Sequence, residues 1–178
     1  TNRKKIIKLL LEKNEITNKH SHNSIQVWMN PHPLNHYKGG LVATYYGRPD
    51  KLEEADRICY YLAKDYNCIG TTNVETNRGE TVSNFKKWNA LKYLSFNPDF
   101  VWDNNLKEKV STTYGYVIGP TNKLEAVRLL KEFLYEEIGK DEQGNTIYMF
   151  HTIYDYQSIL ELKKWAEKGN YDRVSAML

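Results

Sequence analysis

The chain has 178 residues, 40% of them hydrophobic and 26% charged, which indicates a globular protein with one domain, or one domain with an arm. No apolar run approaches the ~20 residues of a membrane span, and no signal-peptide pattern opens the chain. The net charge of +3 permits binding to nucleic acid but does not by itself argue for it. Cys59 and Cys68, the two cysteines, stand on different predicted elements and favour a reduced, cytosolic protein.

The N-terminal part of the chain is expected to form an arm and a first strand. Residues 3–13 have the apolar period of a short amphipathic helix, and residues 24–29 have the composition of a strand. Residues 30–40 contain two prolines and two glycines and are predicted to be a loop. We therefore divide the chain into an N-terminal arm or linker, residues 1–37, and a domain, residues 38–178.

The next part predicts a strand, a helix and a second strand. A β-type run at 41–46 is followed by Asp50 and, three residues later, Glu53, which is the spacing of a capping box. The helical period then marks one buried face: Leu52, Ala55, Ile58, Cys59, Leu62, Ala63 and Tyr66. Residues 68–75 are the second strand. Strands joined by a helix form a parallel pair with a right-handed crossover.

The second half of the chain predicts mostly helices, and residues 99–120 show no clear pattern. The helix at 81–94 has Val82, Phe85, Trp88, Ala90 and Leu91 on its inward face. The remaining expected elements are a helix opened by the capping-box spacing of Asn122 and Glu125 with Leu124 on its apolar face, a turn at 141–145, a strand at 146–150, a helix at 158–168 and a last helix from Tyr171.

Two carboxylates stand where a metal site is plausible. Glu75 ends an apolar run directly before the turn residues Asn77 and Gly79, and strand ends in α/β sheets face the ligand crevice. Asp172 begins the last predicted helix. Oxygen ligands suit Mg²⁺, and hydrolysis of phosphodiesters uses carboxylates that converge on two cations ~3.5–4 Å apart. From these residues alone, a solvated Glu before a turn is the better interpretation.

A set of motifs gives further support. Residues 42–50 (VATYYGRPD) are followed by Glu53, and Glu75-x-Asn77-Arg78-Gly79 and the closing residues 169–176 (GNYDRVSA) come later. In combination they resemble the nuclease domain of tailed-phage large terminase subunits, from about Gly40 to the last residue. Residues 1–37, with Val27-Trp28-x-x-Pro31, look like the segment that precedes this nuclease in the family.

The resemblance implies a ribonuclease H-like fold, a mixed sheet flanked by helices. It implies an endonuclease that cuts concatemeric double-stranded viral DNA with Mg²⁺ or Mn²⁺ at a two-metal site. Glu75 matches the family's second catalytic acid and Asp172 its third, so both would be metal ligands. The family also implies a portal protein and a small terminase subunit as partners, an ATPase domain in the same full-length polypeptide, no membrane contact, and work at the procapsid in the cytoplasm of an infected bacterium.

The sequence departs from this family at the first catalytic acid. That Asp lies on the opening strand in the family, but residues 21–49 here contain neither Asp nor Glu. The opening hairpin is therefore missing from this sequence. We expect residues to have been omitted between Pro33 and Leu41, near Lys38 and Gly39, because loss of a central strand would expose two sheet edges. The alternatives are an inactive ribonuclease H-like docking or DNA-binding module, and a plain α/β domain whose motif matches are accidental.

Several polar residues are weaker candidates. Arg48 is a candidate phosphate contact, with a structural pairing to Asp50 or to a carbonyl as the alternative. Arg78, Lys86 and Lys87 are further candidates for DNA binding. A solvated helix face is the safer interpretation of the two lysines. The pairs His20/His22 and His32/His36 have spacings seen in metal sites, but no cysteine or acid accompanies them in the loop, which favours ordinary loop histidines.

Overall fold

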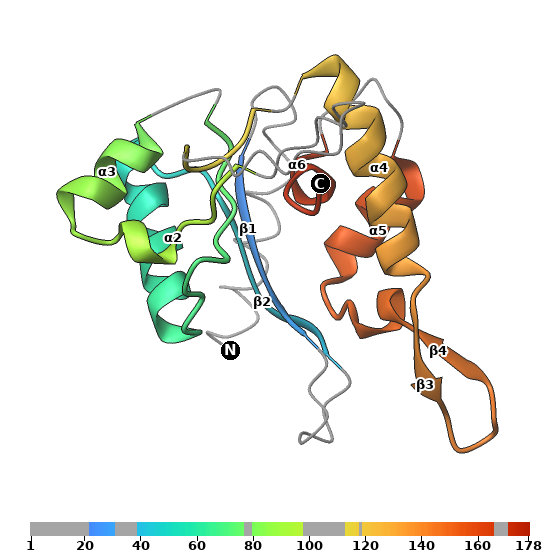
Figure 1. The fold of residues 1–178 in the computed structure, drawn as a ribbon. Coiled ribbons are helices and arrows are strands. Elements are labelled where there is room, and N and C mark those ends of the chain that lie inside the picture. Colours follow the sequence, from blue (N-terminus) through green and yellow to red (C-terminus); the bar gives the residue numbers. More distant parts are fainter. Residues whose placement is uncertain (1–21, 31–38, 77–79, 98–112, 118, 166–170) are drawn as a thin grey trace, which may run out of the picture.

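A computed structural model describes residues 22–30, 39–76, 80–97, 113–117, 119–165 and 171–178. In this part of the chain the fold is mixed α/β, as the sequence predicts. The strands β1 (Asn23–Met29) and β2 (Gly40–Gly47) form a long antiparallel ribbon. Figure 1 shows this ribbon between two groups of helices, with α2 and α3 on one side and α4, α5 and α6 on the other.

The ribbon follows the alternation of its side chains. Ser24 lies opposite Tyr46 and Gln26 lies opposite Thr44, and a bulge follows at Val27 and Trp28. Trp28 packs against the apolar cluster on the side of α4, and Gln26 bonds to the backbone of α6. Successive strand residues point to opposite faces, so Ser24, Gln26 and Tyr46 share this face. Both strands lie where the sequence predicts them.

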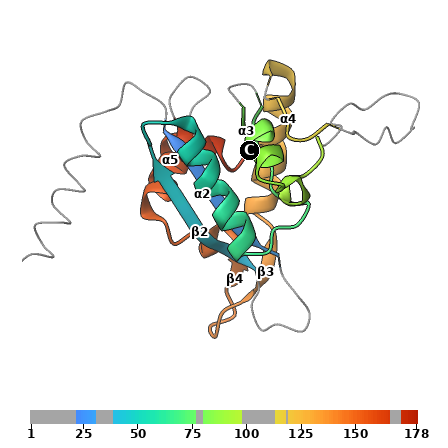
Figure 2. The same cartoon turned by 90° about the vertical axis from the view of Figure 1, so that its left-hand side faces the viewer.

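On the other side of the ribbon, α2 (Leu52–Asp65), α3 (Thr81–Lys87) and the 3-10 helix η1 (Leu91–Tyr93) enclose one core. Figure 2 shows α2 lying across β2. The fully buried members of this core are Ala63, Val74, Phe85, Ala90, Tyr93 and Leu94. The predicted inward residues Phe85 and Ala90 are confirmed as buried, and Val82, Trp88 and Leu91 pack against the same cluster.

Two expectations for α2 are wrong. The helix begins at Leu52 with Lys51 as its N-cap, and no side chain caps it, so Asp50 and Glu53 do not form a capping box. Glu53 instead lies within 3.5 Å of Arg57 and within 3.4 Å of Lys87, which joins α2 to α3. Leu52 and Tyr66, expected on the buried face, are 44% and 46% exposed, because they lie at the two ends of the helix beyond its packed middle.

The predicted helix at 81–94 is interrupted. α3 ends at Lys87, and Asn89 adopts a left-handed conformation with φ +55 before η1 begins. Asn reaches this conformation at low cost because its short polar side chain bonds locally. The break turns the chain so that Ala90, Tyr93 and Leu94 enter the same core as Phe85.

Residues 68–75 also differ from the prediction. They form no regular strand; Thr72 makes a parallel bridge to Leu94 and Glu75 a parallel bridge to Tyr116. In the part of the chain that the structure describes, the ladder partners of this segment are therefore Leu94 and Tyr116, where the sequence predicted β2. Both partners come later in the chain than residues 68–75. The segment therefore pairs with residues that follow it, and the helix that precedes it does not bring it beside β2.

The second group of elements packs on the opposite side of the ribbon. It consists of α4 (Pro120–Leu134), β3 (Glu137–Lys140), β4 (Thr146–Tyr148), the 3-10 helix η2 (Met149–Thr152), α5 (Tyr156–Lys164) and α6 (Asp172–Ser175). Leu41, Leu134 and Ile153 form its buried centre, with Trp28 and Met177 packed against them. Figure 1 shows the hairpin of β3 and β4 projecting below α4.

Most expectations for this group are confirmed, with shifted ends. α4 begins two residues before Asn122, at Pro120, and α5 begins at Tyr156 because Asp155 caps it. The turn at 141–145 is confirmed, since Asp141 Oδ1 accepts the backbone N–H groups of Gln143 and Asn145. Three expectations fail: Asn122 lies inside α4 and does not begin it, β4 ends at Tyr148 and not at Phe150, and Leu124 is 66% exposed although it was expected on the apolar face of α4. In addition, the structure contains β3, which was not predicted.

Other predictions lie outside the described residues. These are the helix at 3–13, Arg78 and the interval 31–38, which contains most of the segment where residues were expected to be omitted. Among the helices that the structure describes, none is long and apolar enough to cross a membrane.

Candidate functional site

Asp172 is held at the start of α6 by the residue that precedes β1. Its Oδ2 accepts the backbone N–H of His22 at 2.7 Å, and the Nδ1 of His22 lies 3.8 Å from the same oxygen. The Asp172 side chain is 13% exposed. A charge-assisted bond of this length fixes the carboxylate, so the acid is both oriented and close to the surface.

The ring of Tyr46 contacts both His22 and Arg173, the residues beside this acid. The His22 ring stacks on it with centroids 4.7 Å apart and planes 21° apart, and the guanidinium carbon of Arg173 lies 3.5 Å from the Tyr46 centroid. Burial raises the pKa of Tyr46, and the Asp172 carboxylate raises it further, while Arg173 acts in the opposite direction. Asp172 therefore acts electrostatically on the phenol that both His22 and Arg173 contact.

Arg173, the next residue in the chain, ties α6 to α5 and to β1. Its Nη1 lies 2.8 Å from Glu161 Oε1 and its Nε lies 3.3 Å from Asp155 Oδ2. Its backbone carbonyl accepts a bond of 3.0 Å from the Gln26 side chain. These contacts hold a helix of four residues, which has little stability of its own.

Glu75 has a different setting. It is exposed and lies on the extended segment that bridges to Tyr116. Tyr116 donates its N–H to the Val74 carbonyl at 2.9 Å, and Thr76 donates both its N–H and its hydroxyl to the Tyr116 carbonyl. Burial raises the pKa of Tyr116, and the Glu75 carboxylate raises it further. The segment holds Glu75 at the surface through backbone bonds on both sides of it.

The close approach of residues 114–116 to the Glu75 segment requires a glycine. A Cβ on Gly115, whose φ is +70, would lie 2.6 Å from Thr76 Cγ2 and 2.6 Å from the Val74 carbonyl oxygen. We expect Gly115→Ala to lower the free energy of unfolding by about 2–4 kcal/mol, the sum of left-handed strain and overpacking. Urea denaturation tests this. Gly144→Ala is the matched control, because Gly144 has φ +84 but nothing within 4 Å of its Cβ; equal losses in the two variants would contradict the prediction.

The structure surrounds the two predicted acids with different residues. Asp172 contacts the residue before β1, and the bridge of Glu75 is to Tyr116, so their convergence on one metal pair stays a prediction. In the described part of the chain, no three His, Cys, Asp or Glu side chains form a group that could hold a metal ion. β1 and β2 contain no Asp or Glu, and the first catalytic acid is not found there.

Comparison with protein-family models, with curated proteins and with solved structures finds no match. A functional interpretation therefore depends on the motifs and on the geometry around them.

Three of the basic candidates, Arg48, Lys86 and Lys87, lie at exposed positions. Arg48 follows β2 directly, and Lys86 and Lys87 occupy the last turn of α3. The Nζ of Lys87 lies 3.4 Å from Glu53 Oε1, so the Glu53 carboxylate partly neutralises its charge. These positions are compatible with contacts to phosphates, which strengthen as salt is lowered.

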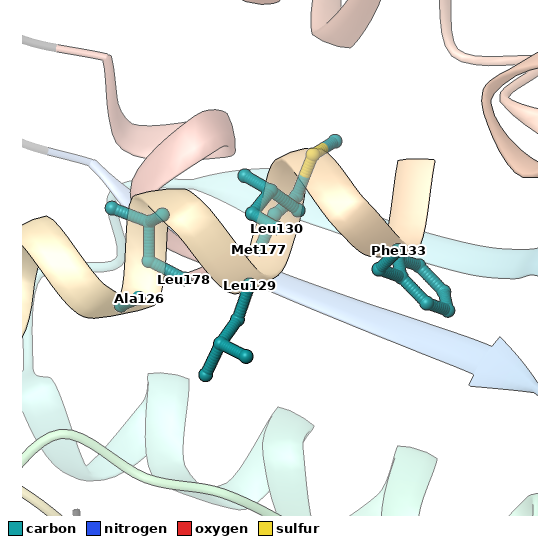
Figure 3. Close-up of a pocket in the computed structure, with 6 residues that line it drawn as sticks. All are labelled: Ala126, Leu129, Leu130, Phe133, Met177 and Leu178. Carbon is teal, nitrogen blue, oxygen red and sulfur yellow. The ribbon is translucent and has the colours of Figure 1, made fainter. Parts of the chain in front are cut away.

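A pocket lies away from these polar groups. Figure 3 shows it between α4 and the last residues of the chain, and the residues that line it have apolar side chains: Ala126, Leu129, Leu130, Phe133, Met177 and Leu178. No charged side chain is among these lining residues.

The sequence did not identify the neighbours of Asp172. His22 was interpreted as a loop histidine because no acid stands near it in the sequence, whereas its partner lies 150 positions later. Tyr46 and Arg173 are part of the motifs at 42–50 and 169–176, and these motifs are the one signal in the sequence that links them. Contacts between residues so far apart leave no local pattern.

Proposed function

We propose that this chain is the metal-dependent endonuclease domain of a tailed-phage terminase large subunit, with a ribonuclease H-like fold, that cuts concatemeric double-stranded DNA. The motifs around Arg48, Glu75 and Asp172 support this. The structural observation that carries the proposal is the setting of Asp172: an oriented carboxylate, 13% exposed, at the start of a helix and beside the ends of the central ribbon. Oriented acids near a surface are what a metal site for DNA cleavage requires.

The residues present fit Mg²⁺ or Mn²⁺ in type, because carboxylate oxygens are the preferred ligands of hard cations. Asp172 and Glu75 would hold the metal, which when bound supplies charge stabilisation at the scissile phosphate and an activated water. His22 contributes its backbone N–H, which keeps one oxygen of Asp172 in a defined direction. The guanidinium of Arg173 is paired with Glu161 and Asp155.

The same proposal names the partners. Double-stranded DNA would contact the exposed residues Arg48, Lys86 and Lys87. Arg78, which lies outside the described residues, is a further candidate contact. A portal protein, a small terminase subunit and an ATPase domain in the same full-length polypeptide would complete the packaging machine at the procapsid, in the cytoplasm of the infected host.

One observation favours a second candidate. The described residues lack a three-ligand group, and β1 and β2 carry no acid. A site with two acids holds its second cation poorly, so an inactive ribonuclease H-like module that docks other components or binds DNA is the alternative function.

Cleavage of supercoiled plasmid by the purified chain distinguishes the two. The nuclease proposal predicts nicked and linear products with Mn²⁺ or Mg²⁺ and none with EDTA. DNA binding at low salt without cleavage at any concentration of either metal would favour the inactive module.

A further inference from the structure

Glu161 on α5 uses both of its carboxylate oxygens on one residue of α6. Oε1 accepts the guanidinium Nη1 of Arg173 at 2.8 Å, and Oε2 accepts the backbone N–H of the same Arg173 at 3.0 Å. The side chains of Glu161 and Arg173 are 18% and 15% exposed, so the pair is largely shielded from water. The Nε of the same guanidinium lies 3.3 Å from Asp155 Oδ2, so loss of Glu161 would leave the shielded Arg173 with one carboxylate partner and its backbone N–H without this acceptor.

The backbone bond is the part that bears on Asp172. The N–H of Arg173 belongs to the peptide group that joins Asp172 to Arg173, so its bond to Glu161 fixes the orientation of that peptide plane. On the other side, the Arg173 carbonyl is fixed by Gln26 at 3.0 Å. α6 is four residues long and depends on such contacts for its position.

The guanidinium completes this arrangement. The guanidinium stacks on the Tyr46 ring, and the His22 ring stacks on Tyr46 as well. These contacts bring the end of β2 and the residue before β1 close to α6. The His22 N–H can then meet the Asp172 carboxylate at 2.7 Å. Among the described residues, the hydrogen bonds of Glu161 go to Arg173, which is bonded covalently to Asp172, so its hydrogen-bonded link to the acid runs through Arg173.

We infer that Glu161 is a positioning residue for the proposed nuclease: by holding both the backbone and the side chain of Arg173, it orients Asp172 for the binding of a divalent cation. This inference rests on the proposed function of Asp172 as a metal ligand. A role limited to joining α5 and α6 would change stability but would leave the direction of the Asp172 carboxylate and its affinity for metal as they are.

The test is Glu161→Gln, studied in the full chain by NMR and with Mn²⁺ as the probe. The backbone amide proton of His22 reports on Asp172 because it donates to that carboxylate, and Asp172→Asn gives its reference position without the charge. In Glu161→Gln without metal, we expect this amide resonance to move from its wild-type position towards that of Asp172→Asn. We expect the Mn²⁺ concentration for half-maximal broadening of this resonance to rise roughly 10–100-fold, as when the partners of metal ligands are changed.

Glu132→Gln is the matched control, because it also removes a carboxylate paired with an arginine, Arg128, but on the exposed surface of α4. It should change neither readout. A wild-type His22 resonance and wild-type Mn²⁺ dependence in Glu161→Gln would overturn the inference. If Glu161→Gln does not fold, Glu161→Asp replaces it, since it keeps the charge but cannot span both bonds; failure of both to fold would also overturn the inference, by making Glu161 a residue of the fold alone.

The two proposals fail in different ways. If wild type cleaves no DNA and Mn²⁺ does not broaden His22, the nuclease proposal fails, while the metal-free shift of the His22 resonance still tests whether Glu161 orients Asp172. If wild type cleaves and Glu161→Gln keeps both readouts unchanged, the positioning role fails and the nuclease proposal stands.

Discussion

Replacing Glu75 or Asp172 by Ala is expected to abolish metal-dependent cleavage of plasmid DNA while the chain stays folded. Each change removes a proposed ligand and with it charge stabilisation at the phosphate, an effect on the order of 10²–10³-fold in rate for a single group. Glu75 is exposed, and Asp172 gives up one bond from a backbone N–H, so neither change should remove much of the core.

The measurement is the initial rate of plasmid nicking at saturating Mn²⁺, with circular dichroism to confirm folding. Glu137→Ala, at an exposed position on β3, is the control for the loss of one negative charge and should cleave as wild type does. Wild-type rates in both the Glu75 and the Asp172 variant would refute their assignment as metal ligands.

The largest expected change in stability is that of Phe85→Ala, at about 3–5 kcal/mol of unfolding free energy. Phe85 is 0% exposed, and its ring meets Tyr60 edge-on at 6.1 Å and Trp88 at 5.9 Å. Truncation would remove the central side chain between α2, α3 and η1 and leave a cavity that these short elements cannot close.

Urea denaturation of the wild type and of Phe85→Ala measures this loss of unfolding free energy. Phe96→Ala is the matched control: Phe96 is 51% exposed and stacks on Tyr114, so its loss should cost less than about 1.5 kcal/mol. Similar losses in the two variants would show that the cluster around Phe85 is not the main core of this side.

Local patterns in the sequence predicted the elements better than their partners. The apolar period of residues 81–94 placed Phe85 and Ala90 in the core, yet it could not show the left-handed Asn89 that ends α3, because an Asn at that position is compatible with both a helix and a turn. The capping-box spacing of Asp50 and Glu53 was misleading, because Glu53 forms ion pairs with Arg57 on α2 and Lys87 on α3 instead.

The candidate site was predicted only as separate acids. Asp172 was expected at the start of a helix and is found there, but its bond to His22 spans 150 positions and has no local signature. Glu75 was expected at the end of a strand beside β2, but its segment is bridged to Leu94 and Tyr116. Leu94 was predicted to end a helix, and Tyr116 lies in the interval 99–120, which shows no clear pattern. Which extended segments pair depends on the tertiary structure that brings them together, and the local sequence does not show it.

The central claim is that Glu75 and Asp172 share one metal site. The most direct test is a crystal structure of the protein soaked in Mn²⁺, with the metal located by its anomalous scattering. We predict Mn²⁺ at about 2.1–2.2 Å from a carboxylate oxygen of Asp172, with the Glu75 carboxylate within about 8 Å of that of Asp172, where both contact the same cation or a bridged pair. Ordered carboxylates well beyond that separation, with no Mn²⁺ at Asp172, would contradict the proposed nuclease.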